Sequence, residues 1–274
     1  MPSLRSITRG AAVAATSLAA TASPAAAIVG GADAPAGKYP STANVTIAKA
    51  FGCTGTLVAP RWVLTAGHCG SITGATGVAT PVSFPGAAFD VTVGTTAADG
   101  TGGERLSVSR AFIPTTYLAG QGSDVTLLEL TAPARTAPTP VAGTGLRGIW
   151  APGVSTEIVG FGVTSEGGDA PDTLQQAVVP VIADATCAQQ VGSSYEDRTQ
   201  LCAGFPQGGT DTCQGDSGGP MYSRTGTGAL RVVGATSYGD GCARPGKPGV
   251  YARVADATLR EWIRGLAPTA VSDQ

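Results

Sequence analysis

Long apolar runs, histidine and charged residues are all scarce in this sequence. No segment approaches the roughly 20 consecutive apolar residues that a transmembrane helix needs, so we expect no membrane anchor. Charged residues make up 13% of the 274 residues and the formal net charge is −2. No basic patch stands out, which argues against nucleic acid as a partner. The chain holds 40 glycines and 19 prolines, a composition typical of a compact β-rich protein and not of a helical or disordered one.

Patterns of metal ligands are missing as well. The cysteines include no Cys-x-x-Cys pair, and His68 is the only histidine, so we expect no metal site and no cofactor. In an exported chain, the six cysteines predict three disulfides. Six cysteines can pair in many ways, and their spacing does not choose among them.

The first 27 residues have the features of a secretory signal. Arg5 and Arg9 precede an Ala-rich run over residues 11–20, and small residues follow up to Ala27. A basic start, a short apolar middle and a small-residue cleavage site are typical of such a segment. We therefore expect a secreted, extracellular protein that begins at Ile28, with residues 23–27 either in the signal or forming a short propeptide.

From Ile28 onward, short alternating or apolar runs recur between turns that contain glycine and proline. They predict an all-β sandwich or set of barrels, with strands at 44–47, 62–64, 89–93, 106–108, 125–130, 178–182, 230–233 and 250–251. Residues 136–145 are a candidate connector between two halves. One helix is expected over 256–266, because its apolar residues follow helical spacing (Leu259, Trp262, Ile263, Leu266) and Asp256 is a suitable N-cap. Residues 267–274 are expected to form a frayed tail.

A serine set between glycines suggests an exposed nucleophile. Ser217 lies in residues 211–220, which read DTCQGDSGGP, and glycines let backbone N–H groups approach a developing oxyanion. A glycine-rich surface turn is the alternative interpretation. A serine nucleophile needs a base, usually a histidine, and a third group that holds this base in the right tautomer. His68 is the one candidate base, and it sits beside Cys69 just after an apolar strand.

The order of these residues along the chain separates the classes of serine hydrolase. An α/β-hydrolase or a similar esterase carries its histidine after its serine, and no histidine follows Ser217. The subtilisin order needs an acid before His68. Only Asp33 qualifies, and the strands here do not alternate with helices as that fold requires. The remaining order is histidine, acid, serine. Asp124 is the best acid, because it opens the apolar run 125–130 and would lie at the mouth of a buried strand.

Five motifs occur in order along the chain: IVGG at 28–31, TAGHC at 65–69, SDVTLL at 123–128, DTCQGDSGGP at 211–220, and SYG at 237–239 with KPGVY at 247–251. Together they resemble the trypsins of the chymotrypsin-like serine protease family, most of all the secreted trypsins of actinomycete bacteria. The resemblance covers nearly all of residues 28–266. It implies two six-stranded antiparallel β-barrels, about 28–140 and 141–255, with the active site between them and a C-terminal helix.

The resemblance also implies roles for single residues. Ser217 corresponds to the nucleophile, His68 to the general base and then acid, and Asp124 to the acid that orients the histidine. The backbone N–H groups of Gly215 and Ser217 correspond to the oxyanion hole. The implied disulfides are Cys53–Cys69, Cys187–Cys202 and Cys213–Cys242. For activation, a freed Ile28 amino group would insert beside Asp216.

The implied substrate pocket has Asp211 at its floor. A buried carboxylate there favours Arg or Lys at the cleaved bond, because leaving it unpaired is costly. Thr212, Ser237, Gly239 and Gly249 match the other pocket positions, and the two glycines leave room for a long side chain. The implied function is a secreted, monomeric serine endopeptidase that acts on proteins or peptides, with protein inhibitors as further candidate partners. The alternative is a non-catalytic binding protein on the same fold.

Several positions depart from the pattern of animal trypsins. Phe161 and Tyr238 stand where tryptophan is common, Gly67 replaces an alanine, and Thr212 replaces a serine but keeps the hydroxyl. Residues 71–82 lack the glutamate pair of the family's calcium loop, so no calcium site is implied. Residues 23–27 contain neither Lys nor Arg, so the chain is not expected to activate itself.

Overall fold

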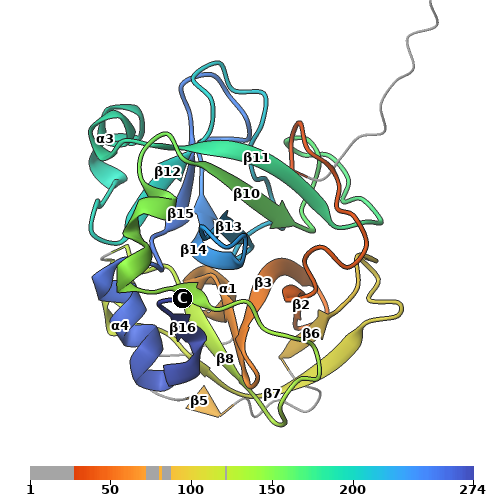
Figure 1. Cartoon of the computed structure of the whole chain (residues 1–274). Coiled ribbons are helices and arrows are strands. Elements are labelled where there is room, and N and C mark those ends of the chain that lie inside the picture. The colour runs from red at the N-terminus through yellow and green to blue at the C-terminus, as the bar shows by residue number, and fades with distance from the viewer. Residues whose placement is uncertain (1–27, 72–79, 82–87, 121) are drawn as a thin grey trace, which may run out of the picture.

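Two closed β-barrels make up most of the structure. The computed structural model describes residues 28–71, 80–81, 88–120 and 122–274 (Figure 1). The expected signal and propeptide, residues 1–27, lie outside the described residues, as does most of the stretch 71–82. In Figure 1 most strands of the C-terminal half lie above those of the N-terminal half.

The first barrel is a cycle of six antiparallel strands. In sheet order they are β7 (Glu104–Phe112), β6 (Phe89–Val93), β2 (Thr42–Ile47), β3 (Phe51–Ala59), β4 (Trp62–Thr65) and β8 (Thr126–Leu130), and β8 pairs back with β7. A short strand, β5 (Thr80–Pro81), adds to β7. In β6, Phe89, Val91 and Val93 are buried while the polar residues between them are not. This alternation is what the two-residue period of a strand imposes when one face lines a core.

The second barrel closes in the same way. Its strands are β13 (Pro220–Arg224), β10 (Ser155–Gly160), β11 (Gln175–Ile182), β12 (Gln200–Ala203), β15 (Gly249–Ala252) and β14 (Leu230–Tyr238), and β14 pairs back with β13. Two short strands, β9 (Val141–Ala142) and β16 (Val271–Ser272), extend this sheet by parallel pairing. The prediction of two six-stranded antiparallel barrels is confirmed.

Helices are few among the described residues. They are α1 (Gly67–Ser71), α2 (Thr115–Leu118), α3 (Asp184–Val191) and α4 (Ala257–Leu266), with 3-10 turns η1 (Thr144–Trp150), η2 (Gly192–Ser194) and η3 (Pro268–Ala270). The expected C-terminal helix is α4, and Asp256 accepts the Ala257 N–H at its start. Leu259 and Ile263 are buried in a cluster that contains residues of both barrels, so α4 packs over the junction between them.

The first and last segments of the described chain, residues 28–33 and 267–274, pack differently from the expectation. Residues 28–33 were expected in the first barrel, but Ile28 is fully buried in the core of the second, and β1 (Ala32–Asp33) pairs with β11. Residues 267–274 were expected to fray. Instead Ala267 and Ala270 are buried and β16 pairs with β9. Burial of these two alanines in the core cluster that α4 covers stabilises the ordered conformation of the tail.

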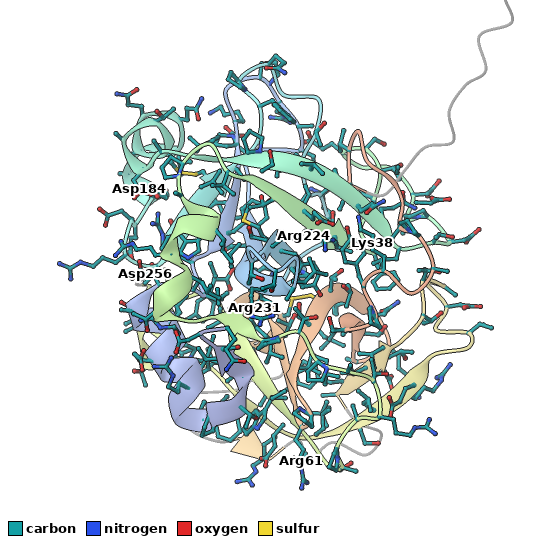
Figure 2. All side chains as sticks on the ribbon, in the orientation of Figure 1. Lys38, Arg61, Asp184, Arg224, Arg231 and Asp256 are labelled. Atoms are coloured by element: carbon teal, nitrogen blue, oxygen red, sulfur yellow. A yellow bond between two sulfur atoms is a disulfide. The ribbon has the colours of Figure 1, made fainter. Side chains whose placement is uncertain are left out.

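A charge cluster fixes the N-terminal segment to the second barrel. Glu157 of β10 pairs with Lys38 at 2.9 Å and with Arg224 at 2.7 Å, and Tyr39 donates its hydroxyl to the same carboxylate. Figure 2 shows Lys38 and Arg224 beside one another. Burial alone would raise the pKa of Glu157, but hydrogen bonds from Arg224, Tyr39 and Lys38 lower it to about 2. Glu157 is therefore ionised at neutral pH and holds these side chains together.

The three disulfides are those that the resemblance implied: Cys53–Cys69, Cys187–Cys202 and Cys213–Cys242. The first joins β3 to α1, next to His68. The third joins the segment before Ser217 to the segment after β14. Each closes a loop of 15 to 29 residues and contributes about 3 kcal/mol to stability in the chain-entropy account.

Candidate active site

Antiparallel pairing of β4 with β8 brings His68 and Asp124 together. Thr65, the last residue of β4, lies opposite Thr126, the first residue of β8, so the residues just after β4 and just before β8 share one edge of the barrel. Asp124 Oδ2 lies 3.0 Å from His68 Nδ1, and Asp124 Oδ1 accepts the His68 backbone N–H at 2.9 Å. Because carboxylate oxygens accept hydrogen bonds, we assign the ring hydrogen to Nδ1, which leaves Nε2 as the basic nitrogen.

Other residues hold the Asp124 carboxylate in place. Ser237, at the end of the second barrel's β14, donates its hydroxyl to Asp124 Oδ2 at 2.5 Å, so the contact joins the two barrels. The sequence departure at Gly67 has a physical reason here. A Cβ at Gly67 would lie 2.9 Å from Asp124 Oδ1 and 3.1 Å from the Tyr117 ring. Tyr117 was not singled out from the sequence, because no pattern marks a lone tyrosine in a short helical turn as a neighbour of Asp124.

The loop that carries Ser217 is bound to the first barrel. The Thr54 backbone N–H donates to the Ser217 carbonyl at 2.9 Å, and the Thr54 hydroxyl donates to the Gly215 carbonyl at 2.9 Å. A Cβ at Gly218 would lie 2.4 Å from the Ala66 backbone nitrogen, so this loop packs directly against the segment before His68. Among the described residues no hydrogen bond joins the Ser217 hydroxyl to the His68 ring. Thr54 and its two bonds to the loop were not anticipated from the sequence.

Backbone conformation leaves two N–H groups of this loop free of partners. Within the described part of the chain, neither the Gly215 nor the Ser217 N–H donates to another protein group. Gly215 has φ of +94°, and a Cβ there would lie 2.8 Å from Gly162 Cα. Only glycine adopts this conformation against such a close neighbour without strain. The two N–H groups are therefore available to an acceptor such as a developing oxyanion.

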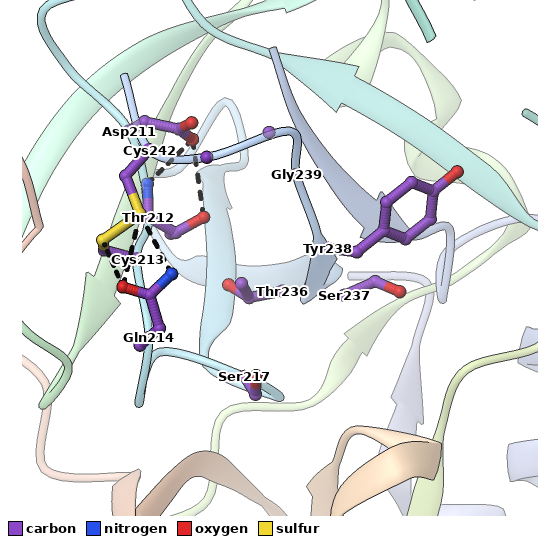
Figure 3. Close-up of a pocket in the computed structure, with 12 residues that line it drawn as sticks. Asp211, Thr212, Cys213, Gln214, Ser217, Thr236, Ser237, Tyr238, Gly239 and Cys242 are labelled. Carbon is purple, nitrogen blue, oxygen red and sulfur yellow. Dashed lines mark hydrogen bonds between the residues drawn. A yellow bond between two sulfur atoms is a disulfide. The ribbon is translucent and has the colours of Figure 1, made fainter. Parts of the chain in front are cut away.

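A cavity of about 240 Å³ opens beside Ser217 (Figure 3). It is lined by all five residues that the resemblance placed around the substrate: Asp211, Thr212, Ser237, Gly239 and Gly249. Asp211 is 4% exposed and accepts the Thr212 N–H at 2.8 Å and the Ala243 N–H at 3.2 Å. A Cβ at Gly249 would lie 2.4 Å from Asp211 Oδ1, so glycine is required at this wall. In Figure 3, Asp211 and Ser217 lie at separate ends of the lining residues.

Two buried carboxylates in this region lack a positive partner among the described residues. Burial raises the pKa of Asp211 to about 6, although hydrogen bonds from Ala243 and Thr212 oppose the shift. Burial likewise raises the pKa of Asp216 to about 7, against hydrogen bonds from Cys213 and Gly162. Asp216 is fully buried. A cation placed beside either group would restore its ionised form.

His68 titrates under opposing influences. Burial of the ring lowers its pKa, but the hydrogen bond and the negative charge of Asp124 raise it, and the net pKa lies above the usual 6.5. A ring nitrogen that titrates in the neutral range is suited to general base and general acid work near neutral pH. By contrast Asp33, the acid that a subtilisin order would need, is exposed in β1 and binds Gln175 at 2.5 Å.

Comparison with known proteins identifies the family of this chain. The family model described as Trypsin matches residues 28–263. A trypsin of Saccharopolyspora erythraea is 44% identical over 229 residues, which cover 83% of this chain and 93% of that protein. This chain belongs to the trypsin family. A trypsin-like protease of Streptomyces glaucescens is 34% identical over 230 residues, 83% of this chain and 78% of that protein. Human serine protease 56 is 35% identical over 255 residues, but the match covers only 38% of that longer protein.

Family membership makes the chain a serine protease, a class whose members act on proteins or peptides. The described residues contain no cluster of three or more His, Cys, Asp or Glu side chains suited to a metal ion. Most of residues 71–82, on which the expectation about calcium depends, lies outside the described part. Within that part, no helix has the length and apolar character needed to span a membrane.

Proposed function

We propose that this trypsin-family protein is a secreted endopeptidase that cleaves peptide bonds after Arg or Lys through an acyl-enzyme on Ser217. One observation carries the specificity: a buried Asp211 carboxylate, without a positive partner among the described residues, lines the same cavity as Ser217. An Arg or Lys side chain that enters this cavity neutralises the carboxylate. An apolar side chain leaves it unpaired at a cost of several kcal/mol.

The chemistry follows from the arrangement of the groups. His68 Nε2 removes the proton of Ser217 Oγ while Oγ attacks the carbonyl carbon of the bound peptide. The carbonyl oxygen becomes an oxyanion and accepts the Gly215 and Ser217 N–H groups. His68 then returns the proton to the leaving amine, and the C–N bond breaks to give the acyl-enzyme. Water attacks in a second round, with His68 again as base, and Ser217 is released. Asp124 holds the ring in the required tautomer throughout.

Activation is the role we assign to Ile28 and Asp216. Val29 forms a β-bridge with Asp211, so the chain start lies beside the segment that leads to Ser217. Removal of residues 1–27 creates an ammonium group on Ile28, a cation that a fully buried Asp216 needs. Their ion pair would hold the Gly215 loop in its oxyanion-binding shape. Signal peptidase cleavage after Ala27 releases this form directly, and cleavage after Ala22 leaves a pentapeptide for another protease.

Substitution of the nucleophile and the base tests the proposal. Wild-type protein with residues 1–27 removed should hydrolyse peptide amides that carry Arg or Lys at the cleaved bond, and should be far slower on Leu. Ser217→Ala or His68→Ala should each lower turnover on the order of 10⁶-fold, because the two residues act as one unit. Ser165→Ala, which changes an exposed serine of the same barrel, is the matched control and should leave turnover unaltered. A wild-type protein that binds peptides without cleaving them would support the non-catalytic alternative.

A further inference from the structure

One residue at the edge of the Asp211 cavity has a strained backbone. Ala243 has φ of +54°, a left-handed conformation that is unfavourable for a residue with a Cβ. In this conformation its N–H donates to Asp211 Oδ2 at 3.2 Å, and its carbonyl accepts the Gly209 N–H at 2.9 Å. The orientation of the Asp211 carboxylate therefore depends in part on a backbone conformation that alanine alone disfavours.

Glu166, in the loop between β10 and β11, binds the residues on both sides of Ala243. Its Oε2 accepts the backbone N–H of Cys242 at 3.4 Å and the Nε–H of Arg244 at 3.1 Å, and its Oε1 accepts Arg244 Nη2–H at 2.6 Å. A two-point contact between carboxylate and guanidinium has a fixed geometry. A Cβ at Gly241, which lines the cavity, would lie 2.7 Å from Glu166 Oε2. The Glu166 carboxylate therefore lies directly against the cavity wall.

The location of this ion pair matters more than its charge attraction. The Glu166 and Arg244 side chains are 44% and 50% exposed, and exposed ion pairs contribute little to stability by themselves. Arg244 also has a longer contact, 3.6 Å, with Asp240 Oδ1. The start of the Glu166 loop is fixed to the cavity lining, because the Val163 N–H donates to the Gln214 carbonyl at 2.7 Å. A half-exposed pair on an anchored loop can therefore restrain the cavity wall while it adds little to overall stability.

We propose that Glu166 is a positioning residue for specificity, which holds Ala243 in the left-handed conformation that keeps its N–H on Asp211. The Arg244 pair and the Cys242 N–H transmit this restraint. Without Glu166, Ala243 relaxes in a fraction of the molecules, and the Asp211 carboxylate loses its single orientation there. A cationic side chain then binds only the competent fraction, which weakens its apparent affinity. The inference rests on the proposed cleavage after Arg or Lys.

Binding of benzamidine, measured by calorimetry, tests the proposal independently of catalysis. Benzamidine carries an amidinium, which pairs with a carboxylate at two points, and has no further side chain. Glu166→Ala should raise its Kd about fivefold, the factor that one net hydrogen bond gives. The KM for an Arg peptide amide should rise by a similar factor, while kcat should change by less than about twofold, because the restraint acts on binding.

A second ion pair of similar exposure supplies the control. Glu261 pairs with Arg264 at 2.9 Å, and their side chains are about as exposed as those of Glu166 and Arg244. Both control residues belong to α4, which does not line the cavity. Glu261→Ala should therefore alter neither the Kd for benzamidine nor the KM for the Arg peptide.

Ala243→Gly supplies a rescue that a merely structural role of Glu166 would not produce. Glycine adopts the left-handed conformation without the Cβ penalty, so Ala243→Gly combined with Glu166→Ala should restore most of the benzamidine affinity although the ion pair is still missing. Thermal unfolding checks that each variant is folded. An unaltered Kd in Glu166→Ala, an equal rise in Glu261→Ala, or a double variant no better than Glu166→Ala would overturn the proposal. If the wild type neither binds benzamidine nor cleaves Arg peptides, the proposed function itself fails, which is a different result.

Discussion

Replacing Asp211 with Asn should weaken the preference for Arg substrates and raise the free energy of unfolding of the protein. Loss of a buried charge partner costs about 3 to 5 kcal/mol, so kcat/KM for an Arg peptide amide should fall roughly a hundredfold to several thousandfold. The rate on a Leu peptide should change little. The triad is untouched, because the hydrogen bonds of the Asp211 carboxylate within the described part of the chain go to Thr212 and Ala243 and to no triad residue.

The stability effect follows from the raised pKa of Asp211. Burial raises that pKa from 3.8 to about 6, and about two pKa units correspond to roughly 3 kcal/mol. Asn keeps an acceptor for Thr212 but loses the bond from Ala243, worth about 1 kcal/mol. The free protein should therefore gain about 2 kcal/mol in its free energy of unfolding at pH 8. The charged form is the one that the fold disfavours, so the wild type should lose stability relative to the variant as pH rises from about 4 to about 6.

Chemical denaturation at pH 4 and pH 8, combined with kinetics on the Arg and Leu peptides, measures both effects. Asp197→Asn is the control, since it removes an exposed acid of the same barrel and should alter neither quantity. An Asp211→Asn protein that still prefers Arg as the wild type does, or that is less stable at pH 8, would refute the reasoning about this pocket.

Three further predictions concern the loop and the base. Gly215→Ala places a Cβ 2.8 Å from Gly162 Cα at a φ of +94° and should lower kcat at least a hundredfold. Gly226→Ala, where a Cβ meets nothing within 4 Å, should leave kcat unchanged. Equal kcat in the two variants would contradict the role of the loop. Adding one residue before Ile28, verified by mass spectrometry, should lower activity sharply because the ammonium can no longer reach Asp216; undiminished activity would refute that ion pair. The pH profile of kcat/KM should fall as pH drops through the pKa of His68, which lies above 6.5, because protonated His68 is no longer a base; a profile that stays flat down to pH 5 would exclude His68.

The strands with clear alternation and the helix with clear apolar spacing can be predicted from the sequence. Strands that break these patterns cannot. In β3, Gly52 and Gly55 interrupt the run, yet a Cβ at Gly55 would lie 2.8 Å from the Leu64 carbonyl oxygen, so glycine is needed for close pairing. In β13, the first residue is Pro220, which reads as a turn. Both strands are stabilised by long-range pairing that no local window contains.

The site residues divide in the same way, into those that a local pattern marks and those that matter through long-range packing. Asp124 was identified because it opens a buried run, and its partner His68 because no other histidine exists. Thr54 and Tyr117 were missed, since their importance comes from packing between segments distant in sequence. The tail was misjudged for the same reason: β16 exists only because β9 lies beside it, more than a hundred residues earlier in the chain.

The nucleophile assignment is tested most directly by active-site labelling. A fluorophosphonate reacts with a serine that is activated by a base and supported by an oxyanion hole. The protein is first prepared with residues 1–27 removed and is then labelled. Peptide mass spectrometry should show one adduct per chain, on Ser217, and His68→Ala should abolish this adduct. An unlabelled Ser217, or an adduct on a different serine, would contradict the account.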